Sequence, residues 1–363
     1  MANDKTTNAP FPGTEAFWKA AAQGQLLLKR CNACGEHHFY PRTHCPFCLS
    51  DRTEWEPSSG RGTLYSFSVP RKVPERIAVA VIELEEGLRL TSAIVDADVD
   101  SLAIGDAVEF YPGGKVPDVR FTTRAAQASR AYVREATRLA AEIPGLPEHD
   151  PASFSQAAVI GAGTMGTGIT MALVNAGIRV LLVDRDFAAV QKGIERIRSN
   201  YDSSVQRGRL AADAAAERMA LITPSDQMKD MASADVVIEA VWEQLGLKRE
   251  IFAAIDAYAR PGALLGTNTS MLDINQIAAS TNRPQDVIGL HFFTPAHAMK
   301  LLEVVRGRLS SDHTISAAMA LARRLGKAPV LVEVCTGFVG NPMFGRRERE
   351  ARRLLLEAPT PEE

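Results

Sequence analysis

Four cysteines near the start of the chain have the spacing of zinc ligands. They form two Cys-x-x-Cys pairs with ten residues between them: Cys31, Cys34, Cys45 and Cys48. Each pair lets two thiolates face one centre, and two pairs supply the closed tetrahedral set of a structural zinc site. A single pair could serve redox chemistry, but two pairs so close together favour metal. Three nearby histidines could replace a cysteine, although exposed loop residues are the simpler interpretation: His37, His38 and His44.

A glycine-rich segment in the second half has the pattern that binds dinucleotides, following an apolar run and opening a helix-length segment. The cofactor-binding residues predicted there are Gly161, Gly163, Thr164, Met165 and Gly166. Glycines at this spacing permit a tight turn and the close approach of a pyrophosphate, although a turn without a ligand is the alternative. Asp184 ends the next apolar run, where an acidic residue binds the ribose hydroxyls. This favours NAD over NADP, although the neighbouring Arg185 weakens that preference a little.

Two polar side chains interrupt apolar runs where an unpaired charge would be costly to bury. His291 lies within Ile288-Gly-Leu-His-Phe-Phe293, and Glu303 lies within Leu301-Leu-Glu-Val-Val305. We expect Glu303 to pair with His291, orienting the ring and stabilising its imidazolium form. A base with an acidic partner suits removal of a hydroxyl proton while hydride passes to NAD.

Asn268 and Ser270 follow the apolar run 264–267, at the carboxyl end of a predicted strand, where α/β sheets bind ligands. The simpler interpretations are a core histidine for His291, an edge-strand charge for Glu303 and a helix cap for Ser270. Spacing alone does not decide between these interpretations and the catalytic one.

Two kinds of element must position these residues, on either side of a proline-rich stretch at 143–151. Before it, alternating runs predict a small antiparallel sheet or barrel: 63–69, 77–82, 108–111 and 119–121. A helix is expected over 124–142. After it, continuous apolar runs alternate with helix-length segments, typical of parallel strands covered on both faces: 157–160, 180–183, 236–238, 264–265, 287–290, 301–305 and 330–334.

Length and composition bound the possibilities. The 363 residues suit two domains or three small ones, and 46% hydrophobic and 23% charged residues exclude a disordered chain, a collagen-like fibre and a coiled coil. The net charge of −2 gives no overall attraction to nucleic acid or membrane. The polar start and the lack of a long apolar run predict no signal peptide and no membrane span, hence a cytoplasmic protein. In that reducing compartment the lone Cys335 is a bystander.

Residues 156–341 resemble the NAD-binding domain of the 3-hydroxyacyl-CoA dehydrogenase family. The matching segments occur in order: VIGAGTMGTGIT, VIEAVWEQLGLKREIF, LLGTNTSML, VIGLHFFTPAHAMKLLEVV and GFVGN. The resemblance implies reversible, NAD-dependent oxidation of an (S)-3-hydroxyacyl-CoA to the 3-oxoacyl-CoA, in fatty-acid or related acyl-CoA metabolism.

The resemblance also implies residue roles. His291 would be the general base and Glu303 its partner, while Ser270 and Asn341 would hydrogen-bond the reacting oxygen and the thioester region. The nicotinamide half of the cofactor would be contacted by Glu243, Lys248 and Asn268. The CoA moiety would lie near Asn200 and Arg207. A family asparagine is replaced here by Thr294, a change expected to alter nicotinamide contacts without removing the chemistry.

The first half resembles the DUF35 family, a rubredoxin-like zinc ribbon followed by an acyl-CoA-associated OB fold, through Phe17-Trp18, the cysteine pairs, 62–67 and 104–110. The expected fold class is thus multidomain: a zinc ribbon and a small antiparallel OB-like β-barrel, then an α/β Rossmann domain. The expected boundaries are a helical lead at 1–30, ribbon 31–55, barrel 56–124, helix and linker 125–155, Rossmann domain 156–341 and a charged tail at 342–363.

Only 22 residues follow Asn341, where the family continues with a helical domain that closes the acyl pocket and builds the dimer. A truncation, a split gene or a shifted reading frame would each explain this. The leading hypothesis is an NAD-dependent 3-hydroxyacyl-CoA dehydrogenase that also binds structural zinc, as a homo-oligomer or with a separate CoA-enzyme subunit. The second is an acyl-CoA-binding or docking subunit that needs a partner for activity. The third is a single-stranded nucleic-acid binder. It is supported only by a modest basic cluster, and we expect no such binding. The cluster consists of Arg61, Arg71, Lys72 and Arg76.

Overall fold

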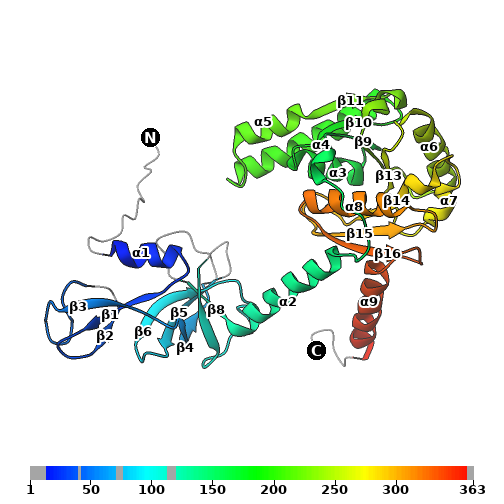
Figure 1. Cartoon of the computed structure of the whole chain (residues 1–363). Helices are drawn as coiled ribbons and strands as arrows, with labels where there is room; N and C mark the ends of the chain where they lie inside the picture. The colour runs from blue at the N-terminus through cyan, green and yellow to red at the C-terminus, as the bar shows by residue number, and fades with distance from the viewer. Residues whose placement is uncertain (1–13, 40–41, 71–76, 113–119, 358–363) are drawn as a thin grey trace. The chain divides into compact units, whose positions relative to one another are not determined.

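The computed structural model describes residues 14–39, 42–70, 77–112 and 120–357. They divide into two compact units at residues 135 and 136, within helix α2 (Arg124–Ala141) (Figure 1). Three of the four residues of the predicted basic cluster, Arg71, Lys72 and Arg76, lie outside the described residues.

The first unit begins with helix α1 (Glu15–Ala22) and a small antiparallel sheet of order β2-β1-β3. Its strands are β1 (Leu27–Cys31), β2 (His37–His38) and β3 (Thr53–Pro57). Phe17 of α1 is fully buried and contacts the rings of Phe39 and Trp55, so the helix packs on the sheet that carries the cysteine pairs.

A closed barrel of order β4-β5-β6-β8-β7 follows. Its strands are β4 (Arg61–Ser68), β5 (Ala78–Leu84), β6 (Arg89–Ile94), β7 (Ala107–Tyr111) and β8 (Arg120–Thr123). Buried and exposed residues alternate along β5, as expected for a strand with one face in a barrel core. Leu64, Ile82 and Phe121 share that core with Phe17, so ribbon and barrel form one hydrophobic cluster.

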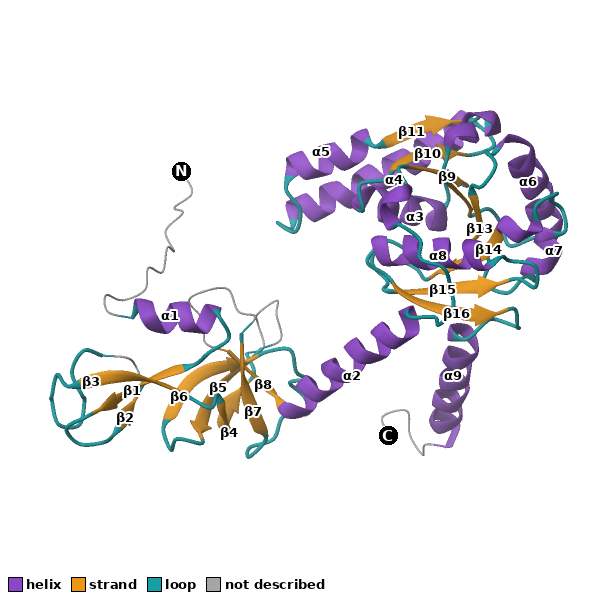
Figure 2. Cartoon of the chain, viewed as in Figure 1, coloured by secondary structure: helices purple, strands orange, loops and turns teal. Residues whose placement is uncertain are grey.

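The second unit is built on a sheet of order β11-β10-β9-β12-β13-β14-β15-β16 (Figure 2). These strands are β9 (Gln156–Ile160), β10 (Arg179–Val183), β11 (Ile222–Ser225), β12 (Val236–Glu239), β13 (Leu264–Thr267), β14 (Val287–Phe292), β15 (Leu301–Arg306) and β16 (Ala328–Glu333). The strand order reverses between β9 and β12. The carboxyl ends of these two strands therefore flank the crevice where such sheets bind ligands.

Helices cover both faces of this sheet. Helices α3 (Thr164–Asn175), α4 (Phe187–Gln206) and α8 (Asp312–Arg324) share one core with the strands, and α6 (Leu245–Tyr258) and α7 (Ile274–Ala278) share the other. Helix α5 (Ala212–Ala220) follows α4, and α9 (Gly340–Glu357) ends the described chain. The predicted fold class, ribbon and barrel followed by a Rossmann domain, is confirmed.

The expectation of parallel strands throughout this sheet is wrong for one pair, because β15 runs antiparallel to β14 and aligns Glu303 with His291. The connection from Phe292 to Leu301 spans residues 293–300, fewer than the dozen that a parallel crossover needs. Among the described residues, no helix is both long and apolar enough to cross a membrane.

The proline-rich linker is fastened to the second unit through its backbone. Three side chains of α8 donate to main-chain carbonyls of residues 141, 147, 151 and 154: Ser316, Arg323 and Arg324. Arg324 makes two of these contacts, one of them 2.9 Å long to the carbonyl of residue 151. The linker therefore packs against α8 instead of hanging free.

Candidate functional site

The glycine-rich turn between β9 and α3 is shaped by close backbone approach. A Cβ added at Gly166 would lie 1.7 Å from the Gly161 carbonyl oxygen, and one at Gly161 would lie 2.6 Å from the Ala240 oxygen. Gly161 also has φ +105°, a conformation that favours glycine. A Cβ at Gly163 would instead meet no described atom within 4 Å. Two glycines are thus required by packing, and the third leaves open space.

That open space lies at the N-terminus of α3, where Gly163 is the N-cap and no side chain caps the helix. Free N–H groups and the helix dipole make such a terminus a site for phosphate. Thr164 and Met165 begin the helix. Asp184 lies at the end of β10 and accepts hydrogen bonds from the N–H groups of Ala162 (2.6 Å) and Arg185 (2.7 Å). Turn, helix terminus and carboxylate together fit a dinucleotide.

His291 and Glu303 face each other across β14 and β15. His291 Nδ1 lies 2.7 Å from Glu303 Oε2, and the two residues are 4% and 1% exposed. The imidazole also lies between two rings, with centroid distances of 4.5 Å to Phe293 and 5.6 Å to Phe338. Since Nδ1 is engaged by the carboxylate, Nε2 is the nitrogen left for a ligand.

The second oxygen of Glu303 is held by the start of α9. Oε1 accepts hydrogen bonds from the N–H groups of Val339 (2.9 Å) and Gly340 (2.8 Å). Burial by itself raises the pKa of this carboxyl group, but the bonds from His291 and the two N–H groups outweigh it and hold the pKa below its ordinary value. Glu303 is therefore kept as a carboxylate.

Asn268, Ser270 and Asn341 come together beside this pair. The Asn268 side-chain oxygen accepts from the N–H of Phe292 at 3.0 Å, next to His291. Asn341 Nδ2 donates to the Ser270 carbonyl oxygen at 3.3 Å. Residues from β13, β14, β15 and the start of α9 thus meet at the carboxyl edge of the sheet.

Glu243 and Lys248 lie behind that edge. Glu243 Oε1 accepts from Thr269 Oγ1 (2.5 Å) and from the N–H groups of Ser270 (2.7 Å) and Met271 (3.1 Å). Lys248 is fully buried and lies 2.7 Å from Glu239, a residue that the sequence analysis did not single out. Burial raises the pKa of Glu239 above its ordinary value, although the positive charge of Lys248 acts to lower it. The only sequence signal for Glu239 is a carboxylate inside the apolar run Val236-Val-Ile-Glu-Ala.

The four N-terminal cysteines converge. Their Sγ atoms all lie within 4.8 Å of one another, and all four thiols are free. Such a set of thiolates fits a tetrahedral zinc ion. The nearby His37 instead contacts Glu56 Oε2 at 2.7 Å, and His44 contacts Thr43. Cys335 is exposed in the other unit.

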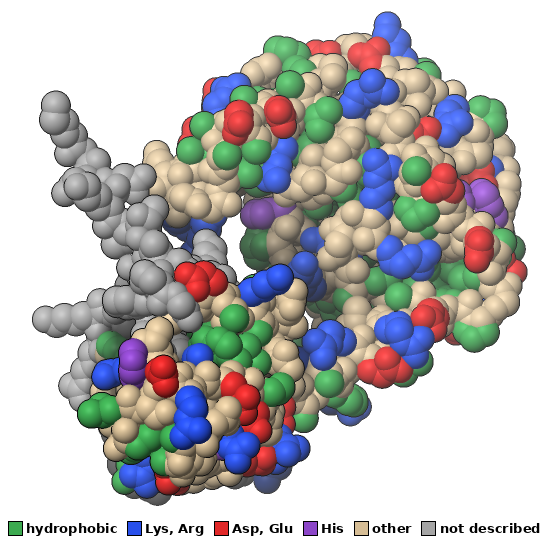
Figure 3. Space-filling view, turned by 60° about the vertical axis from the view of Figure 1, so that its left-hand side comes forward, with side chains coloured by type: hydrophobic (Ala, Val, Ile, Leu, Met, Phe, Trp, Pro, Cys, Tyr) green, Lys and Arg blue, Asp and Glu red, His purple; other side chains and the backbone are tan. Residues whose placement is uncertain are grey.

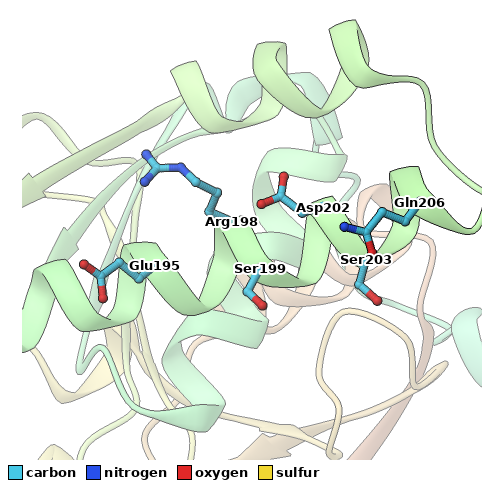
Figure 4. Close-up of a pocket in the computed structure, with 6 residues that line it drawn as sticks. All are labelled: Glu195, Arg198, Ser199, Asp202, Ser203 and Gln206. Atoms are coloured by element: carbon cyan, nitrogen blue, oxygen red, sulfur yellow. The ribbon is translucent and has the colours of Figure 1, made fainter.

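Helix α4 carries a polar hollow of about 340 Å³. Its lining, drawn in Figure 4, comes from one face of that helix: Glu195, Arg198, Ser199, Asp202, Ser203 and Gln206. Asn200 and Arg207 are exposed on α4 and at its C-cap, outside this lining. Their expected contact with CoA stays a prediction.

The barrel offers little support for nucleic-acid binding among its described residues. Arg61, the described member of the basic cluster, pairs with Glu85 at 2.9 Å. On the face of the first unit seen in Figure 3, acidic and basic side chains are interspersed. This visible face therefore differs from the one-sided positive surface typical of nucleic-acid binders.

Fold and site together define a dinucleotide-binding Rossmann domain joined to a zinc ribbon and an OB-type barrel. The model of the 3-hydroxyacyl-CoA dehydrogenase NAD binding domain matches residues 156–335. Models of the ChsH2 rubredoxin-like zinc ribbon and of the ChsH2 C-terminal OB-fold domain match residues 18–54 and 55–111. The resemblances seen in the sequence are thus confirmed for both halves.

Individual relatives agree with the family models. The chain is 37% identical to the (S)-3-hydroxybutyryl-CoA dehydrogenase of Ralstonia eutropha, with a TM-score of 0.54 and coverage of 56% of this chain and 72% of that one. The Escherichia coli 3-hydroxybutyryl-CoA dehydrogenase is 38% identical, with a TM-score of 0.54 and coverage of 56% and 43%. The chain belongs to the 3-hydroxyacyl-CoA dehydrogenase family.

The similarity extends to larger proteins. The peroxisomal bifunctional enzyme of Cavia porcellus is 42% identical over 211 residues, 58% of this chain and 29% of that relative. The chain therefore spans less than a third of the length of this relative.

Proposed function

We propose that this protein oxidises (S)-3-hydroxyacyl-CoA to 3-oxoacyl-CoA with NAD, reversibly. The observation that carries the proposal is the buried His291–Glu303 pair, 2.7 Å apart at the same sheet edge as a dinucleotide-binding turn. The family membership and the names of the relatives, 3-hydroxybutyryl-CoA dehydrogenases, support the same reaction.

In this proposal His291 is the general base. Its Nε2 takes the proton of the 3-hydroxyl group as the C3 hydride leaves, and it returns the proton in the reverse direction. Glu303 fixes the Nδ1–H tautomer and stabilises the imidazolium that forms, a role supported by its low pKa. Bound NAD⁺ supplies the hydride acceptor.

We assign orientation of the substrate to the polar residues beside the pair. The Ser270 hydroxyl and the Asn341 amide would hydrogen-bond the reacting oxygen and the thioester region, and Asn268 would contact the nicotinamide. The Gly161–Gly166 turn would hold the pyrophosphate, and Asp184 would accept the ribose hydroxyls. Ser270 and Asn341 already lie close together through the 3.3 Å bond between them, which supports this assignment.

The test is NADH oxidation by the purified full chain with acetoacetyl-CoA. We expect turnover, and we expect His291→Ala to reduce kcat at least about 10²-fold, the usual contribution of a general base. His313→Ala, an exposed histidine on α8, serves as the matched control and should leave kcat unchanged. A folded protein that binds NADH but shows no turnover would contradict the proposal.

For the first unit we propose recognition of acyl-CoA or of a CoA-enzyme partner, with zinc in a structural role. The support is the match to the ribbon and OB-fold domains together with the four converging thiols. Acyl-CoA binding by a Cys45→Ser variant separates the two alternatives. Loss of acyl-CoA affinity favours recognition of the ligand, and unchanged affinity favours docking of a partner.

A further inference from the structure

The ion pair between Glu239 and Lys248 is a buried polar feature to which the proposed chemistry gives no role. Both side chains have no exposed surface, and Lys248 Nζ lies 2.7 Å from Glu239 Oε1. Taking two charges out of water is costly, and such pairs often contribute no net stability compared with apolar residues of similar size. A role in folding alone is therefore a weak explanation for this pair.

The pair joins the ends of two strands. Glu239 Oε1 also accepts from the N–H of Val241 (2.7 Å), just beyond β12, and Oε2 accepts from Thr267 Oγ1 (2.7 Å) at the end of β13. Lys248, on α6, donates to the Asn268 carbonyl oxygen at 3.2 Å. The Glu239–Lys248 pair thus connects the carboxyl ends of β12 and β13 to helix α6. These strand ends face the crevice.

Two branches lead from this centre to the site, one made of hydrogen bonds and one that begins with an ion pair. In one, Lys248 holds the Asn268 backbone, and the Asn268 side chain holds the N–H of Phe292, next to His291. In the other, Lys248 lies 3.6 Å from Glu243 Oε2, and Glu243 Oε1 binds the N–H of Ser270 at 2.7 Å. These contacts connect the buried pair to Asn268 and to the N–H of Ser270.

We propose that Glu239 and Lys248 are positioning residues that fix Asn268 and the 269–271 turn against the nicotinamide end of the cofactor. This inference rests on the proposed function for the identity of the ligand. It gives Lys248 a role in holding the site, beside the cofactor contact that the family resemblance implies.

The test compares two ligands of the full chain by calorimetric titration. NADH spans the whole site, whereas ADP-ribose lacks the nicotinamide and reaches only the half bound by the Gly161–Gly166 turn and Asp184. Glu239→Gln should weaken NADH binding by about 10–100-fold, the loss expected for a charged hydrogen-bond network, and leave ADP-ribose affinity within about twofold.

Asp256→Asn is the matched control. Asp256 is a half-buried carboxylate, 2.9 Å from Arg283, in the same unit but outside the site. This variant should lower the melting temperature without changing the ratio of NADH to ADP-ribose affinity. Equal loss of both ligands in Glu239→Gln, or unchanged NADH affinity, overturns the proposal.

A double variant guards against misfolding. Glu239→Leu with Lys248→Met removes both charges, leaves neither one uncompensated, and should fold. It should show the same selective loss of NADH affinity. If neither variant folds, the pair has a structural role and the proposal is wrong. This test measures binding, so its result does not depend on whether the wild-type protein turns over acetoacetyl-CoA. A lack of turnover would contradict only the proposed function.

Discussion

Replacing Glu303 by glutamine tests how the structure controls the tautomer of His291. The two N–H groups of Val339 and Gly340 donate to Oε1, so they require an acceptor there, which in glutamine is the amide oxygen. The glutamine –NH₂ is therefore forced toward His291 Nδ1, where it donates a hydrogen bond. The imidazole must then carry its proton on Nε2 and has no lone pair facing the substrate.

The magnitude follows from this tautomer argument. In the serine-protease triad, the same carboxylate-to-amide change traps the wrong tautomer and lowers kcat by about 10⁴-fold. Glu303→Gln should lower kcat for NAD⁺ reduction with (S)-3-hydroxybutyryl-CoA, the direction in which His291 accepts the proton, by about 10³–10⁴-fold, equivalent to roughly 4–5.5 kcal/mol of barrier. The NADH affinity should change little, because Glu303 lies behind the ring.

The control is Glu333→Gln, an exposed glutamate on the adjacent strand β16. It should leave kcat unchanged. A Glu303→Gln protein that keeps a wild-type melting temperature and a kcat within tenfold of wild type would refute the reasoning, because it would mean that the tautomer of His291 does not depend on Glu303.

Three further predictions concern other parts of the chain. Gly166→Ala should destabilise the second unit by about 1–3 kcal/mol and abolish the thermal shift caused by NADH, since its Cβ would lie 1.7 Å from a backbone oxygen; a normal NADH shift would contradict this. Cys45→Ser should reduce bound zinc, measured by metal analysis, and unfold the first unit while NADH binding persists. Asp235→Asn should destabilise the fold at neutral pH. Burial raises the pKa of Asp235, but hydrogen bonds from Gln156 and Ser155 outweigh this and lower it overall, so the difference from wild type in urea titrations should vanish as pH falls below 3.8.

Most of the fold could be predicted from the sequence because its signals are local. Alternating runs mark the barrel strands, and the glycine spacing marks the turn after β9. The antiparallel direction of β15 was missed because its apolar run is as continuous as that of a parallel strand. The length of the connection at 293–300 was the available signal.

The site was predictable where a charged residue interrupts an apolar run, as at Glu303. The sequence does not predict which backbone N–H groups donate to such a residue. The N–H groups of Val339 and Gly340 come from a turn more than thirty residues away. Backbone donors carry no signature in the side-chain pattern, so the sequence alone does not predict this part of the site.

The anchoring of the linker to α8 has an evolutionary consequence. Every acceptor in it is a main-chain carbonyl, and every donor is a side chain of Ser316, Arg323 or Arg324. The backbone path of the linker and the three donors are thus constrained together, and the side chains of Ile143 and Leu146 are constrained as well because they pack against the hydrophobic core. A comparison of homologues that share this fusion should find the three donors and apolar residues at positions 143 and 146 retained, with wider variation at exposed positions such as Pro144 and Glu148.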